Sequence, residues 1–174
     1  TIAEQLDGLL RIQELDTEIY RLNRQKNATP AILEQARQAL EGEKRRLALE
    51  ENEWKDLQVK RKAKEVDLGS KEGLVKKYQT QLYQVKTNKE YTSLQGEIGG
   101  LKADNSLLEE EILRLMEEAD QKKTSLAQIK EGVDRLSESY RQEELRVQKE
   151  IETLVRELDQ LLTRRQALLP EVDS

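Results

Sequence analysis

The side chains that most often carry out catalysis or bind metals are scarce in this sequence. No histidine and no cysteine occurs among its 174 residues. The usual general base, the thiol nucleophile and the soft metal ligands are therefore all missing. The glycine-rich stretch at residues 96–100 matches no nucleotide-binding fingerprint. We expect no enzymatic activity and no bound metal or cofactor within this chain.

Carboxylates occur in two short runs, Glu109-Glu110-Glu111 and Glu117-Glu118. Consecutive residues of a helix point in different directions, so neither run gathers its oxygens around one ion. A solvated helix face is favoured over a divalent-cation site.

Lysines and tyrosines gather in the middle of the chain. The candidates for partner binding are Lys76, Lys77, Lys86, Asn88, Lys89 and Tyr91, with Tyr83 beside them. Cations with stacking rings suit nucleic acid, and tyrosines also suit a protein partner. The residue types leave both classes open. A second basic stretch, residues 60–64, could touch phosphates, although pairing with an acidic helix, or plain solvation, is the favoured explanation.

Composition and periodicity predict that these residues lie on long helices. The chain is 37% charged and 3% aromatic, with two prolines, which suits helices packed in pairs better than a deep core. Apolar residues recur seven apart, for example Leu94, Leu101, Leu108 and Leu115 beside Ile98, Asn105, Ile112 and Ala119. This heptad pattern predicts a coiled coil in which Asn105 fixes the register. The eleven-residue step from Leu136 to Val147 predicts a stutter near residues 137–150.

The helical pattern stops where the lysines gather. Thr87-Asn88-Lys89-Glu90 fits a capping box, in which Thr87 is the N-cap and Glu90 bonds back to it. A connection of one to three residues makes the flanking helices antiparallel. Residues 55–89 carry a net charge of +6 and residues 92–121 a net charge of −6, and such stretches attract when they lie side by side. We predict a hairpin with its tip at about residues 86–89.

The predicted fold is all-α, an elongated antiparallel coiled-coil hairpin of one short and two long helices. The expected segments are residues 1–28, 29–86 and 87–169, followed at 170–174 by the start of a linker. Thr29 is the predicted N-cap of a helix that begins at Pro30. The first two helices together are about as long as the third, which favours an arrangement in which they lie end to end along it. The alternative, in which the first helix folds back, stays open. Gly96, Gly99 and Gly100 are predicted to let the backbones approach near the tip.

The tip sequence Val85-Lys86-Thr87-Asn88-Lys89-Glu90-Tyr91, followed by Leu94-Gln95 and Glu97-Ile98, resembles a known signature. It is similar to that of the bacterial C4-type zinc-ribbon family with an N-terminal long coiled-coil hairpin. Ile12-Gln13-Glu14-Leu15-Asp16 and the third helix around residues 110–117 resemble that family in character. The family's ribbon binds zinc through two pairs of cysteines, so zinc is implied only for a ribbon that is missing from this chain.

The resemblance implies a cytoplasmic, non-enzymatic adaptor that binds protein partners. These would include the sigma factor of the sigma-54 class and components of flagellar or type III secretion systems. A nucleic-acid-binding factor that uses the basic tip is one alternative, and a structural spacer or homo-oligomer is another. A monomer or weak dimer is expected. The net charge of −5 and the lack of a long apolar run argue against membrane binding.

Overall fold

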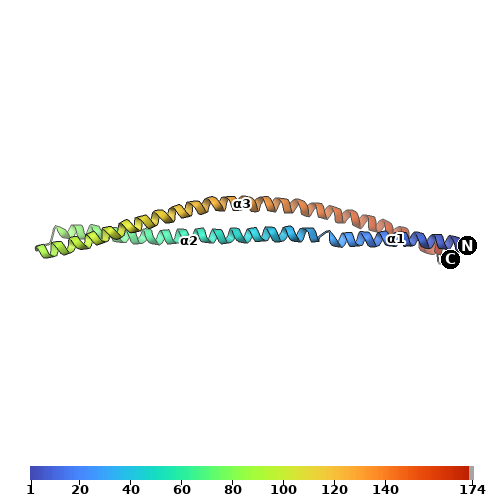
Figure 1. The fold of residues 1–174 in the computed structure, drawn as a ribbon, viewed down its shortest axis with the longest axis horizontal. Helices are drawn as coiled ribbons and strands as arrows, with labels where there is room; N and C mark the ends of the chain where they lie inside the picture. The colour runs from blue at the N-terminus through green and yellow to red at the C-terminus, as the bar shows by residue number, and fades with distance from the viewer. Residues whose placement is uncertain (173–174) are drawn as a thin grey trace. The chain divides into compact units, whose positions relative to one another are not determined.

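The computed structural model describes residues 1–172, and helices make up nearly all of them (Figure 1). The helices are α1 (Ile2–Ala28), α2 (Ala31–Leu82) and α3 (Asn88–Val172). No strand occurs within the described range. The predicted all-α helical hairpin is confirmed.

The contacts of the chain divide it into two compact units. The terminal unit contains Thr1–Glu43 and the part of α3 from Gly132 onward, and the hairpin unit is Lys44–Glu131. Each unit contains an antiparallel pairing of helices that is described separately below.

In the hairpin unit, the later part of α2 lies antiparallel to the first half of α3 (Figure 1). Lys64 Nζ lies 2.7 Å from a Glu111 carboxylate oxygen, and Lys71 Nζ lies 3.8 Å from one of Asp104. A step of seven residues toward the C-terminus of α2 therefore corresponds to a step of seven residues toward the N-terminus of α3. The predicted pairing of the basic stretch with the acidic one is confirmed at these positions.

The two helices of the hairpin unit contribute unequally to its interior. The buried residues of α3 are Ile98, Asn105, Leu108, Ile112, Ala119 and Ile129, whereas α2 contributes Val75. Arg61, Lys64 and Lys71 are half-buried along α2, and their aliphatic stems cover apolar surface while their charges reach the edge. Trp54 is also half-buried, and its indole Nε1 has no hydrogen-bond partner among the described residues.

The terminal unit is held together mainly by apolar contacts. Leu22 of α1 packs with Leu154 and Leu158 of α3, and Ile19 and Leu161 pack against this cluster. The three leucines are between 3% and 6% exposed. An apolar stripe of this kind provides most of the stability of a helix pair in water.

An ion pair fixes the direction of pairing in the terminal unit. Arg165 Nε donates to Asp16 Oδ1 over 2.5 Å, and Gln25 Nε2 donates to Glu150 Oε1 over 3.5 Å. Because Gln25 follows Asp16 in α1 whereas Glu150 precedes Arg165 in α3, these two helices are antiparallel.

The junction between α1 and α2 differs from its prediction. Thr29 Oγ1 donates to the carbonyl oxygen of Gln25 over 2.7 Å, and Thr29 has helical backbone angles, so it closes α1 instead of capping α2. The same Gln25 carbonyl oxygen also accepts the Thr29 backbone N–H over 3.0 Å, and a threonine hydroxyl at a helix end commonly bonds back to the carbonyl four residues earlier. The break between the two helices covers residues 29–30, and the first part of α2 continues from α1 without folding back (Figure 1).

Two details of α3 also differ from their predictions. Leu136 is 37% exposed, whereas Ser137 and Tyr140 are half-buried. Within the predicted stutter, Ser137 therefore takes the half-buried seam position in place of Leu136. A pattern of apolar residues does not identify a serine as a seam residue. At its end, α3 runs through Pro170 to Val172 where a linker was predicted, and the last two residues of that linker lie outside the described range.

The glycines near the turn do not serve close packing. A Cβ atom added at Gly96, Gly99 or Gly100 would meet nothing within 4 Å. The prediction that they allow the two backbones to approach is therefore wrong. These positions lie on the outer side of α3.

Candidate partner-binding site at the hairpin turn

The turn between α2 and α3 is longer than the sequence predicted. Helix α2 ends at Leu82, so residues 83–87 form the connection. The N–H groups of Tyr83 and Gln84 bond to carbonyl oxygens three residues back, over 3.3 and 2.9 Å. This tight last turn ends the helix before Lys86, the predicted end.

The start of α3 has half of the predicted capping box. The Glu90 N–H donates to Thr87 Oγ1 over 3.2 Å, which makes Thr87 the N-cap. No return bond from the Thr87 N–H to the Glu90 carboxylate is present in the part of the chain that the structure describes. The Thr92 hydroxyl donates to the carbonyl oxygen of Asn88, which holds the first turn of α3.

Two tyrosines border a groove beside the turn. The groove has a volume of about 620 Å³ and is lined by Lys76, Gln79, Thr80, Leu82, Tyr83 and Tyr91. Tyr83 is 93% exposed and Tyr91 43% exposed. Gln95 Nε2 donates to the Tyr91 hydroxyl over 3.2 Å and so orients this ring. An exposed ring beside a held ring is the type of surface on which an incoming apolar group can pack.

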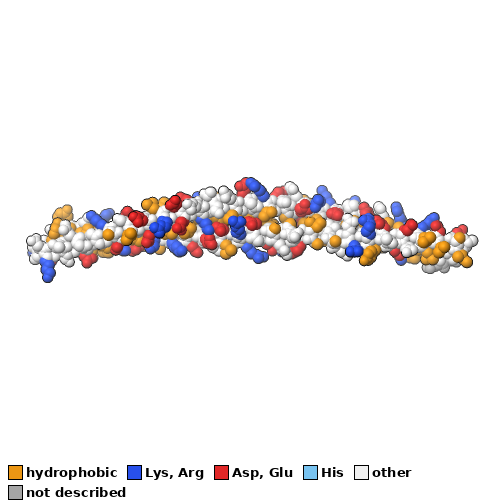
Figure 2. Space-filling view, in the orientation of Figure 1, with side chains coloured by type: hydrophobic (Ala, Val, Ile, Leu, Met, Phe, Trp, Pro, Cys, Tyr) orange, Lys and Arg blue, Asp and Glu red, His pale blue; other side chains and the backbone are white. Residues whose placement is uncertain are grey.

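The four lysines around the turn have no ion-pair partner among the described residues. They are Lys76, Lys77, Lys86 and Lys89, and all are exposed. Lys64 and Lys71, lower on α2, do have partners on α3. On the face that Figure 2 shows, basic and acidic side chains are interspersed along the helices. Exposed lysines without an ion-pair partner in the described chain also occur lower on α2, for example Lys60 and Lys62, so the turn is set apart by having such lysines beside the exposed rings of Tyr83 and Tyr91.

The structure brings only some of the predicted site residues together. Lys76 and Tyr91 line the groove, whereas Lys77, Lys86, Asn88 and Lys89 are exposed around the turn without lining it. Sequence reasoning missed Gln79 and Thr80, which carry no residue-type signal. Only the point at which α2 ends reveals that they border a groove.

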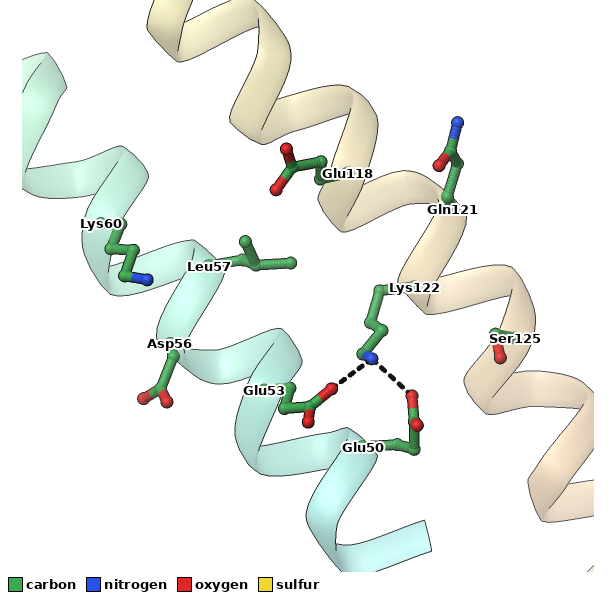
Figure 3. A pocket seen from close by; sticks show the side chains of 9 residues that line it. All are labelled: Glu50, Glu53, Asp56, Leu57, Lys60, Glu118, Gln121, Lys122 and Ser125. Atoms are coloured by element: carbon green, nitrogen blue, oxygen red, sulfur yellow. Dashed lines mark hydrogen bonds and ion pairs between the residues drawn. The ribbon is translucent and has the colours of Figure 1, made fainter. Parts of the chain in front are cut away.

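A second feature of the hairpin unit is an ionic clamp in mid-helix, formed by Lys122 of α3 with Glu50 and Glu53 of α2 (Figure 3). Lys122 Nζ lies 2.6 Å from Glu50 and is also bonded to Glu53. Hydrogen bonding to Glu50, and then to Glu53, raises the pKa of Lys122 above its ordinary value. Lys122 lies seven residues after Leu115 and so continues that heptad row, but the spacing does not show which residues of α2 it meets.

In the first acidic run, one residue forms an ion pair across the hairpin unit. Glu111 pairs with Lys64, and this hydrogen bond lowers the pKa of the Glu111 carboxyl while it raises the pKa of Lys64. Glu118 borders the groove beside the Lys122 clamp. Among residues 1–172, no group of three or more acidic, histidine or cysteine side chains is placed to hold a metal ion.

None of the helices, as far as they are described, has an apolar stretch long enough to cross a bilayer. The zinc implied by the family resemblance does not fit these 174 residues, because its cysteine ligands are not among them.

Comparisons with solved structures support the helical hairpin. CT398 from Chlamydia trachomatis superposes with a TM-score of 0.83 at 24% identity, over 97% of this chain and 72% of that one. The HP0958 protein from Helicobacter pylori superposes with a TM-score of 0.66 at 20% identity, over 95% of this chain and 70% of that one. At these identities the likeness shows the fold.

Among curated proteins, none matches this sequence closely enough to count as a relative. The family profile described as "CT398-like coiled coil hairpin domain" matches residues 12–174, which is most of the chain. The chain therefore belongs to the family of CT398-like coiled-coil hairpin domains.

Proposed function

We propose that this chain is a cytoplasmic, non-enzymatic adaptor that binds protein partners through its hairpin turn. The observation that carries the proposal is the group of lysines at the turn that have no partner among the described residues, beside the exposed rings of Tyr83 and Tyr91. Desolvating a tyrosine ring and pairing a free lysine both favour association, whereas the paired lysines lower on α2 are already satisfied.

The family resemblance of residues 85–91 suggests which partners to test first. They are a sigma factor of the sigma-54 class and components of flagellar or type III secretion systems. Two long helices joined by a short turn can present one binding surface to such a partner at the turn.

The test is capture of the purified sigma factor by the immobilised chain. The tip variant Lys86→Ala/Asn88→Ala/Lys89→Ala/Tyr91→Ala is expected to lose about 90% of the captured partner, as hot-spot truncation does. The matched control Tyr20→Ala/Lys60→Ala/Lys62→Ala removes one exposed ring and two exposed lysines far from the turn in sequence, and should capture as wild type does. Equal capture by both variants would remove the turn from the proposal.

Nucleic-acid binding is a second candidate, favoured by the same lysines together with the 93% exposed ring of Tyr83. Cations and a stacking ring are the usual elements of single-strand binding. Affinity for a single-stranded oligonucleotide should then fall steeply as salt rises. The absence of binding at low salt would exclude this candidate for the chain.

A further inference from the structure

We infer that the groove beside the turn takes an acidic peptide segment of a partner protein, with an apolar side chain of that segment packed against Tyr83 and Tyr91. The inference rests on the proposed function and names the chemistry of the partner. It follows from the charge around the turn, the lining of the groove, and a second groove that adjoins the first.

Charge at the turn is opposite to that of the protein as a whole. Residues 76–91 contain four lysines and one glutamate, a net charge of +3, whereas the chain carries −5. Within the described residues these lysines lack ion-pair partners. A carboxylate brought to the turn would meet lysines without partners, whereas residues 92–121 of α3, with a net charge of −6, would repel it. Charge therefore favours an acidic segment at the turn over one along that part of α3.

The lining of the first groove suits a peptide that carries one apolar anchor. Leu82 and the two tyrosine rings provide an apolar wall, and Gln79 with Thr80 provides hydrogen-bonding groups. An anchor that packs on rings while its backbone bonds to neighbouring amides and hydroxyls is a common mode of peptide recognition.

A second groove gives the bound segment a direction. It has a volume of about 580 Å³ and is lined by Glu72, Val75, Lys76, Gln79, Lys102, Asn105, Ser106 and Glu109. Lys76 and Gln79 line both grooves, so the two adjoin each other. Asn105 is 8% exposed, and its Oδ1 has no hydrogen-bond partner in the described chain.

The same second groove favours a peptide over a nucleic acid. Its lining combines Glu72 and Glu109 with Lys76 and Lys102. Such a mixed lining suits a segment that carries both signs of charge, whereas a nucleic-acid strand carries a phosphate at every position, including those beside Glu72 and Glu109. A peptide can place its carboxylates at the turn and a neutral or basic residue near Glu72 and Glu109. We therefore commit to a peptide with acidic residues at the end nearest the turn.

The experiment selects peptides without assuming the partner. A phage-displayed library of random 12-residue peptides is panned on the wild-type chain, and the most enriched peptide is synthesised with a fluorescent label. We expect enriched peptides to combine several Asp or Glu residues with an aromatic or large aliphatic residue. The charge variant Lys76→Glu/Lys86→Glu/Lys89→Glu should weaken binding of the labelled peptide by at least about tenfold in anisotropy.

Two further variants show whether a loss of peptide binding comes from a lost contact in the groove or from a loss of the fold. Tyr83→Ala changes a side chain that is 93% exposed, so the fold should persist while affinity falls by about tenfold, as for a hot-spot ring. The control Lys60→Glu/Lys62→Glu, elsewhere on α2, should bind the peptide as wild type does. Helical circular dichroism of all variants confirms that they are folded.

Each other outcome overturns the inference in a distinguishable way. Enrichment of basic or neutral peptides whose binding still needs Tyr83 would reject the acidic class and leave the turn as a protein-docking site. Enrichment of no peptide, with a 12-nucleotide single-stranded RNA bound through the same lysines, would replace the peptide by nucleic acid. Acidic peptides that bind the charge variant and Tyr83→Ala as tightly as wild type would reject the groove itself.

Discussion

The terminal unit and the hairpin unit are both antiparallel helix pairs, but different forces hold them together. In the terminal unit, Leu22, Leu154 and Leu158 form an apolar cluster that both helices share. In the hairpin unit, the buried apolar residues of α3 face a surface of α2 on which charged residues such as Lys64 and Lys71 take seam positions. One pairing is mainly apolar, and the other is partly ionic.

This difference shows what an ionic seam does to the rest of the hairpin unit. Lysines that have a carboxylate across the seam are satisfied, whereas lysines beyond the last acidic partner are not. Within the described residues, basic charge without a partner also occurs at Lys60 and Lys62, but at the turn it lies beside the exposed ring of Tyr83. Ionic pairing also depends on salt and pH, which apolar pairing does not.

The largest expected effect belongs to the apolar cluster. Leu154→Ala should lower the free energy of unfolding by about 3 kcal/mol, because it removes a buried side chain and leaves a cavity. Urea unfolding followed by helical circular dichroism measures the change. Leu162→Ala, at a position that is 48% exposed, is the matched control and should have little effect. Equal losses in the two variants would contradict an apolar core in the terminal unit.

Glycine substitutions should have opposite consequences in the two units. Gly99→Ala should raise the free energy of unfolding by about 1 kcal/mol, because alanine is the better helix former and the added Cβ meets open space. At Gly8 the added Cβ would lie 2.9 Å from Val172 Cγ2, so Gly8→Ala should gain less or lose stability. Thermal unfolding of both variants measures the two changes in stability. A smaller increase in stability for Gly99→Ala than for Gly8→Ala would contradict the open space at Gly99 and the close contact at Gly8.

Charge reversal in the ionic clamp should have a smaller effect that depends on salt. Lys122→Glu places a third carboxylate beside Glu50 and Glu53, so the urea midpoint should fall by less than it does in Leu154→Ala. The deficit should shrink at high salt. Adding Glu50→Lys to Lys122→Glu should recover part of the loss. A deficit that stays the same from low to high salt would show that Lys122 acts through packing.

The smallest expected effect is the pH dependence of one ion pair. Lys64 lowers the pKa of the Glu111 carboxyl below its ordinary value of 4.5, so the stability that Glu111 adds is complete above pH 4.5. This stability is lost as the pH falls through the lowered pKa. Hydrogen bonding to Glu111 raises the pKa of Lys64 above its ordinary value of 10.5, so the pair weakens only at pH values above that.

Urea midpoints of wild type and Glu111→Gln, measured from pH 7 downward, isolate this pair from the other carboxylates. The wild-type advantage should be present at pH 7 and should vanish by about pH 2. An advantage that persists undiminished in acid would show that Glu111 does not act as a carboxylate.

Most of the fold could be predicted from the sequence. Heptad spacing predicts the long paired helices, and the opposite net charges of residues 55–89 and 92–121 predict which stretches lie side by side. The role of Thr29 between α1 and α2 could not be predicted, since a threonine hydroxyl can cap the helix that follows or bond back to the helix that precedes it. In the structure it bonds back to Gln25. The clamp partners of Lys122 were also hidden, because Glu53 lies 69 residues away. Residue types indicated the lysines and tyrosines of the site, but Gln79 and Thr80 depend on the point at which α2 ends.

Site-specific photocrosslinking tests most directly whether partners bind at the turn. A photoreactive phenylalanine analogue replaces Tyr83 in one sample and Val59, which is 68% exposed in the same unit, in another. With the purified sigma factor, we predict an adduct from position 83 that disappears when Lys76, Lys86 and Lys89 are changed to glutamate, and none from position 59. Adducts of equal yield from both positions, or an adduct at 83 that survives the lysine changes, would contradict the proposed role of the turn.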